Sequence, residues 1–125
     1  MEFRVMSKMI VKKPWGTYEV LLDEPNYKVK RIVVHPYERF SLQYHKHREE
    51  HWVVVEGDGI VQVNEKEYPA YVRTHWVILP TQKHRATAGP NGLVFIETQT
   101  GDCYEEDIVR LEDDYGRLDS SEVSV

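Results

Sequence analysis

Short apolar runs of strand length dominate the middle of the chain. Eight segments are rich in valine, isoleucine and aromatic residues, and they cover residues 18–22, 27–34, 40–47, 51–56, 60–64, 71–72, 76–79 and 93–98. Clusters rich in glycine, proline and asparagine separate several of them, at residues 24–26, 35–36, 57–59 and 89–92. Residues 105–113 offer a candidate helix of about two turns. Many short strands in one small chain predict an all-β barrel or sandwich.

The length of 125 residues corresponds to one domain. We expect this domain to span residues 13–117. Residues 1–12 are expected to form either a leader or an edge strand, and the small, polar residues 118–125 a flexible tail.

Composition narrows the class of protein. Hydrophobic residues make up 41% of the chain and charged residues 30%, which is too apolar for disorder. Apolar runs reach only four residues, whereas a membrane-spanning helix needs about 20, and charged residues interrupt the start where a signal peptide needs an apolar centre. The single cysteine, Cys103, fits a reducing compartment, and the net charge of −5 argues against nucleic acid. We therefore expect a cytoplasmic protein with neither a membrane nor a nucleic-acid partner.

Three of the six histidines fall within seven residues, at His45, His47 and His51. Residues two apart on a strand point to the same face, so His45 and His47 are predicted to offer two imidazoles to one metal ion. His51 follows an expected turn at residues 48–49, and His84 follows a strand further along the chain. Both are candidates to complete the site.

Other polar residues near this cluster have separate interpretations. Gln43 precedes His45 by two residues and shares its face, where a buried polar group needs a metal, water or substrate as partner. His35 and His75 are isolated in their segments, and isolated histidines are usually structural or solvated.

The stretch Ser41–Gly57 closely resembles the signature of type II phosphomannose isomerases, which are cupin domains often found at the C-terminus of bifunctional mannose-1-phosphate guanylyltransferases. Further segments resemble the same family in the same order, at residues 13–16, 18–20, 27–32, 95–101, 106–110 and 113–117. The resemblance implies an all-β cupin double-stranded β-barrel (jelly roll), a bound metal ion and a homodimer. It also implies interconversion of mannose 6-phosphate and fructose 6-phosphate.

The chain departs from the family pattern at positions that usually hold glycine. Tyr37 follows Pro36 where the family has Pro-Gly, Thr74 stands at a glycine position, and the segment Pro80–His84 lacks its glycine and is one residue shorter. Because glycine adopts positive φ without strain, we expect a different shape for the loop that presents His84.

Many cupins hold their metal with three histidines and a glutamate. Counting four residues on from His47 reaches His51, so the expected ligands are His45, His47, His51 and His84, with Glu50 as the alternative to His51. One divalent ion is expected. The resemblance to the family favours zinc, and manganese, iron, nickel or cobalt also suit imidazole ligands.

Aldose–ketose isomerisation moves a proton between C1 and C2 and therefore needs a base. Glu97, on an otherwise apolar strand face, and Glu50, beside the ligands, are the two candidates. The substrate phosphate needs a cation, and Arg31 alternates with apolar residues in a way that predicts an inward side chain. Arg48 is the second phosphate candidate, and Gln43 is a further substrate-binding candidate.

Two other classes of function stay open at this stage. The same histidines would serve another metal cupin enzyme, such as an iron or manganese oxygenase, and a non-catalytic cupin would bind a sugar. The dimer contact is expected at an exposed sheet face or at apolar N-terminal residues, namely Val5, Met6, Met9, Ile10 and Val11.

Overall fold

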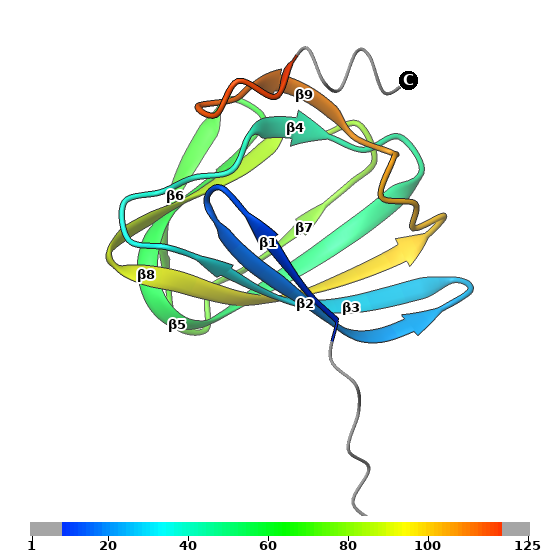
Figure 1. Ribbon diagram of the computed structural model, residues 1–125, viewed down its shortest axis with the longest axis horizontal. Helices are drawn as coiled ribbons and strands as arrows, with labels where there is room; N and C mark the ends of the chain where they lie inside the picture. Colours follow the sequence, from blue (N-terminus) through cyan, green and yellow to red (C-terminus); the bar gives the residue numbers. More distant parts are fainter. Residues whose placement is uncertain (1–8, 119–125) are drawn as a thin grey trace, which may run out of the picture.

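The computed structural model describes residues 9–118, and its elements are β-strands (Figure 1). Their bounds are β1 (Met9–Lys13), β2 (Gly16–Glu24), β3 (Tyr27–Val34), β4 (Leu42–Tyr44), β5 (Arg48–Val63), β6 (Lys66–Tyr71), β7 (His75–Ile78), β8 (His84–Gly101) and β9 (Val109–Glu112). The described residues include no helix with the length and apolar character needed to cross a membrane.

The two longest strands, β5 and β8, pair antiparallel along almost their whole length and contribute to both walls of a barrel (Figure 1). On one wall, the first half of β5 pairs with β7, and the second half of β8 pairs with β3, which is followed in the sheet by β2 and β1. On the opposite wall, the second half of β5 pairs with β6, and the first half of β8 pairs with β4, which in turn pairs with β9. The double-stranded β-barrel expected from the sequence is confirmed.

Two predicted turns are bends inside these long strands. Residues 57–59 lie in β5 and residues 89–92 lie in β8, and the pairing register shifts between Gly57 and Gly59. A Cβ on Gly57 would lie 2.1 Å from the carbonyl oxygen of Gly92, and one on Gly59 would lie 2.0 Å from that of Thr87. The glycines are therefore needed where the two backbones approach closely and cross from one wall to the other.

Two other segments differ from the prediction. The expected strand 40–47 is shortened to β4, because the chain bends after Tyr44. The candidate helix 105–113 is absent, and β9 forms there instead because residues 109–112 pair with β4. Residues 9–13 form the edge strand β1, whereas residues 1–8 and most of the predicted tail lie outside the described residues.

Inward positions change from polar to apolar along three adjacent strands. The apolar members are Ile32 and Val34 on β3, Trp52 and Val54 on β5, and Leu93 and Phe95 on β8, and all are buried. The polar members, also buried, are Lys28 and Lys30 on β3, Arg48 and Glu50 on β5, and Glu97 and Gln99 on β8. The barrel thus has an apolar core in one half and a polar chamber in the other.

Two departures from the family pattern have a left-handed backbone. Tyr37 has a φ of 64° and Thr81 has a φ of 72°, a region that favours glycine. The loop that presents His84 therefore holds a β-branched residue in a strained conformation.

Candidate metal centre

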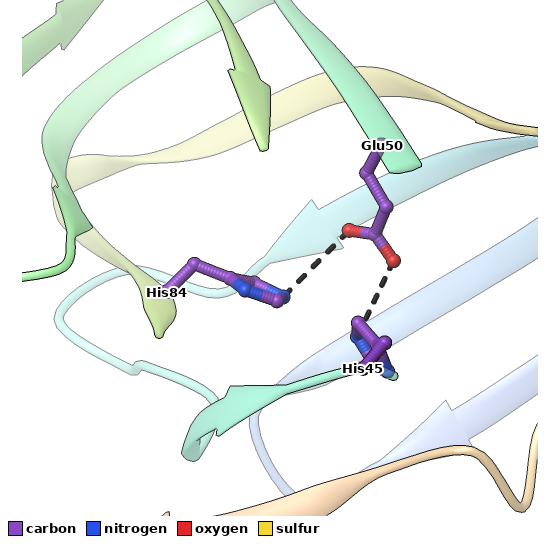
Figure 2. Close-up of side chains that lie close together, drawn as sticks. All are labelled: His45, Glu50 and His84. Atoms are coloured by element: carbon purple, nitrogen blue, oxygen red, sulfur yellow. Dashed lines mark ion pairs between the residues drawn. The ribbon is translucent and has the colours of Figure 1, made fainter. Parts of the chain in front are cut away.

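Three buried side chains from separate parts of the barrel meet in the polar chamber (Figure 2). His45 follows β4, Glu50 is on the inner face of β5, and His84 begins β8. The His45 Nε2 atom lies 3.3 Å from Glu50 Oε2, and the His84 Nε2 atom lies 3.7 Å from Glu50 Oε1. One donor atom from each residue lies within 4.8 Å of the other two, so the cluster is compact enough to hold one metal ion.

The hydrogen bonds of both histidines leave Nε2 as the nitrogen that is available to a metal ion. His84 Nδ1 donates to the carbonyl of Gln82 at 2.9 Å, and His45 Nδ1 donates to the carbonyl of Asp107. Each Nε2 therefore carries the lone pair, and among the described residues that of His84 has no hydrogen-bond partner although it is buried. Burial, with the neighbouring Arg48 guanidinium, lowers the pKa of His45 to about 3, and burial lowers that of His84 to about 4. Both imidazoles are thus neutral at pH 7, as metal ligands must be.

The donor set fits a divalent ion. Two imidazoles and one carboxylate are the protein ligands of many catalytic metal sites, in which further coordination positions are left for water or substrate. Gln43 pairs with His84 between β4 and β8, and it lines the same cavity as His45. Its amide oxygen accepts a hydrogen bond from Ser41 Oγ at 3.0 Å.

The predicted set of four histidines is wrong, and the alternative ligand Glu50 is present in the cluster. His47 is exposed, because β4 ends before His45 and the two histidines do not share a strand face. His51 is also exposed, on the outer face of β5, where its Nε2 lies 3.4 Å from Nδ1 of His75. The inner face of β5 begins at Arg48 and therefore includes residue 50 and excludes residue 51.

The prediction that Arg31 points into the barrel is also wrong. Its side chain is 40% exposed and forms an ion pair with Glu56 at 3.7 Å. The inward cations of β3 are Lys28 and Lys30, which both pair with Glu105. The apolar residues that share a face with Arg31 lie on the outer side of this strand, so their alternation marks the outer face and not the inner one.

Glu97 is a second buried carboxylate beside the cluster. The indole N–H of Trp52 donates both to Glu50 Oε1 and to Glu97 Oε1, each at 3.0 Å. Gln99 Nε2 donates to Glu97 Oε2 at 2.6 Å. Burial, together with the nearby charge of Glu50, raises the pKa of Glu97 to about 7. The expected candidate base therefore lies next to the candidate metal centre.

A cavity of about 150 Å³ opens beside these residues. Its polar wall includes Gln43, His45, Arg48 and Glu97, and its apolar wall includes Trp15, Ile32, Phe40 and Ile108. The structure thus brings together every sequence-predicted site residue except His47, His51 and Arg31.

Besides Lys30, which is paired with Glu105, three further cations that the sequence did not indicate line the same cavity: Lys13, Arg110 and Arg117. Burial and the charges of the two arginines lower the pKa of Lys13, and burial and Arg117 lower that of Arg110. Arg117 forms an ion pair with Asp113, whereas Arg110 Nε is buried without a hydrogen-bond partner among residues 9–118. We call these three residues the cationic rim, and mutually repelling cations favour an anionic ligand.

The double-stranded barrel and its buried histidine–carboxylate cluster define a cupin. The family model described as mannose-6-phosphate isomerase C-terminal matches residues 3–113, and the chain belongs to this family. The family expected from the sequence is confirmed.

Two curated relatives are longer proteins. The chain is 36% identical over 110 residues to mannose-1-phosphate guanylyltransferase of Klebsiella pneumoniae, and 41% identical over 109 residues to the alginate biosynthesis protein AlgA of Pseudomonas aeruginosa. Each alignment covers 86% of this chain but 23% of the relative. The chain therefore spans about a quarter of the length of these relatives.

Solved structures share the fold of this chain at low sequence identity. A nucleoside dehydratase superposes with a TM-score of 0.73 at 17% identity, covering 90% of this chain and 93% of the other. An RmlC-like cupin from Shewanella frigidimarina superposes with a TM-score of 0.72 at 20% identity, covering 80% of this chain and 88% of the other. At these identities the likeness shows the cupin fold alone.

Proposed function

We propose that this protein is a metal-dependent isomerase that interconverts mannose 6-phosphate and fructose 6-phosphate. One cavity carries this proposal, because its lining combines His45 of the His45–Glu50–His84 cluster, the second carboxylate Glu97 and the cationic rim. Membership of the mannose-6-phosphate isomerase C-terminal family supports this choice of substrate. We also propose a cytoplasmic location, in keeping with the single cysteine.

A divalent ion held by His45, Glu50 and His84, with zinc as the first candidate, would stabilise the negative charge that develops on the C1 and C2 oxygens of the sugar. Glu97 is the base in this proposal, because it borders the cavity whereas Glu50 belongs to the ligand cluster. It takes the proton from C2 of the aldose and delivers it to C1, while the hydroxyl proton moves from the C2 oxygen to the C1 oxygen.

The cationic rim holds the phosphate in place of Arg31. Lys13 and Arg110 line the cavity, where burial lowers both pKa values and repulsion adds to it, from Arg110 on Lys13 and from Arg117 on Arg110. A phosphate dianion beside these cations would offset that repulsion. Arg110 also has a buried Nε atom that lacks a partner among the described residues and is therefore available to a phosphate oxygen. Binding the phosphate at the rim orients the reacting carbons of the same sugar in the cavity.

A coupled assay with mannose 6-phosphate tests this function on protein loaded in turn with zinc, manganese, cobalt, nickel and iron. Arg110→Met should raise KM by about tenfold or more and also lower kcat, since remote binding energy positions the reacting carbons. Arg31→Met is the matched control and should leave both constants unchanged, because Arg31 lies outside the barrel. Absence of isomerisation above background with every metal would refute the proposal in favour of an oxygenase or a sugar-binding cupin.

A further inference from the structure

The guanidinium of Arg48 lies inside the ligand cluster. Arg48 is 6% exposed and precedes Glu50 by two residues on the inner face of β5. Its Nε donates to Glu50 Oε2 at 2.8 Å, its Nη2 donates to His45 Nε2 at 3.1 Å, and its Nη1 donates to the carbonyl of Tyr104 at 3.1 Å. Two of the three atoms that accept hydrogen bonds from Arg48 are therefore atoms that would coordinate a metal ion in the cluster.

The bond to His45 excludes a metal ion at the same atom. Because His45 Nδ1 donates its proton to the carbonyl of Asp107, Nε2 has a single in-plane lone pair. A lone pair that accepts a guanidinium proton is unavailable to an ion. A carboxylate oxygen such as Glu50 Oε2 has a further lone pair and can be shared.

The two histidines of the cluster differ in this respect. Among residues 9–118, His84 Nε2 has no hydrogen-bond partner, whereas His45 Nε2 is occupied by Arg48. One ligand is therefore open and the other is capped by an internal cation that also neutralises Glu50.

We propose that Arg48 competes with the metal ion for His45 Nε2 and stabilises the cluster when no ion is bound, an inference that rests on the proposed metal centre. Metal binding then moves Nη2 away from His45. The released N–H groups are at the cavity wall, because Arg48 lines the cavity, and they become donors for a substrate oxygen. Arg48 thus links loading of the metal to the binding of the sugar.

This competition predicts opposite effects on the two forms of the protein. Without Arg48, the buried charge of Glu50 lacks its partner in the metal-free protein, which should unfold at a lower temperature. In the loaded protein the ion neutralises Glu50 and meets no competitor at His45. A merely structural role of Arg48 would instead weaken both forms.

The test titrates Zn²⁺ into chelator-treated wild type, Arg48→Met, Arg48→Lys and the surface control Arg31→Met by calorimetry with a competing chelator. Arg48→Met should bind Zn²⁺ at least about tenfold more tightly than wild type. Its metal-free form should have a lower Tm than metal-free wild type, and the addition of zinc should raise its Tm by more than it raises that of wild type. Arg48→Lys keeps a positive charge beside Glu50 and so preserves the fold. It should also bind Zn²⁺ more tightly than wild type, because an ammonium group cannot donate to both acceptors as a fork. Arg31→Met should match wild type.

Two results overturn the competition. If wild type binds Zn²⁺ and both Arg48 variants bind it equally or more weakly, the competition is refuted while the metal centre stands. If no variant binds Zn²⁺, or any of the other divalent ions, the metal centre is refuted and the role of Arg48 with it.

Discussion

Glu50→Gln separates the observed ligand cluster from the set of four histidines. Glu50 is 1% exposed, and its two oxygens lie 3.3 Å and 3.7 Å from the Nε2 atoms of His45 and His84. Glutamine keeps the shape and one oxygen donor but removes the negative charge. Opposite unit charges 4 Å apart attract by about 4 kcal/mol at an effective dielectric constant of about 20. Since the amide oxygen retains part of the interaction, we expect a loss of about 3 kcal/mol, which is about a hundredfold in the Kd for the metal.

The assay is isothermal titration of Zn²⁺ into metal-free protein, with circular dichroism to verify that the variant is folded. His51→Ala is the matched control, because His51 is exposed on the outer face of the same strand and should leave the Kd unchanged. Equal losses of affinity in the two variants, or an unchanged Kd in Glu50→Gln, would show that Glu50 is not a ligand.

Three other features of the barrel allow predictions away from the ligand cluster. Thr81→Gly should stabilise the protein by about 1 kcal/mol and raise its Tm by about 3–5 °C in scanning calorimetry, because a β-branched residue at a φ of 72° is strained; an unchanged or lower Tm contradicts this. Partial burial alone would raise the pKa of Glu105, but Lys30 and Lys28 lower it from 4.5 to about 2. Above pH 4.5, Glu105→Gln should therefore have a lower free energy of unfolding than wild type, by the full contribution of the charged carboxylate. The difference between the two proteins should vanish as the pH falls towards 2. A difference that does not depend on pH in urea unfolding would contradict this. We also propose a homodimer that buries the outer face around Val77, which is 50% exposed, so light scattering should give twice the chain mass of 14.8 kDa and not a single-chain mass.

The strands could be predicted because alternating apolar residues have the period of a pleated sheet. The predicted segment 27–34 coincides with β3, and the predicted segment 76–79 overlaps β7. The glycine clusters at 57–59 and 89–92 did not reveal that β5 and β8 each continue through them as one long strand. A tight turn and a bend in two adjacent strands both require glycine, and only the pairing of β5 with β8 distinguishes them.

The ligand cluster was predicted in part. His45 and His84 were expected as ligands and Glu50 as an alternative, but the choice of His51 placed the inner face of β5 one residue out of register. Since side chains alternate with a period of two, such a slip moves every residue to the other face. Arg31 was predicted on the wrong face for a different reason. The polar chamber inside the barrel reverses the usual rule that apolar residues mark the inner face, so Lys28 and Lys30 point inward.

The cationic rim has no local signal in the sequence. Lys13 ends β1 near the start of the chain, and Arg110 lies in β9 near its end. Each is an ordinary charged residue in its own segment, and the ring of strands alone brings both to one cavity. Residues that are far apart in sequence and unremarkable in type become a candidate phosphate site through topology.

Trp52 connects the apolar core to the candidate metal centre. The centroid of its ring lies 4.5 Å from that of Phe95 and 5.5 Å from that of His84. Its indole N–H donates to Glu50 and to Glu97, at 3.0 Å each. Because the indole is rigid, the core contacts that fix the ring also fix the position of the N–H, and with it the approach of the two carboxylates. Packing in the apolar half of the barrel therefore helps to set the separation between Glu50 and the proposed base Glu97, together with the bonds that Arg48 donates to Glu50 and Gln99 donates to Glu97. A core substitution that tilts Trp52 should shift both carboxylates.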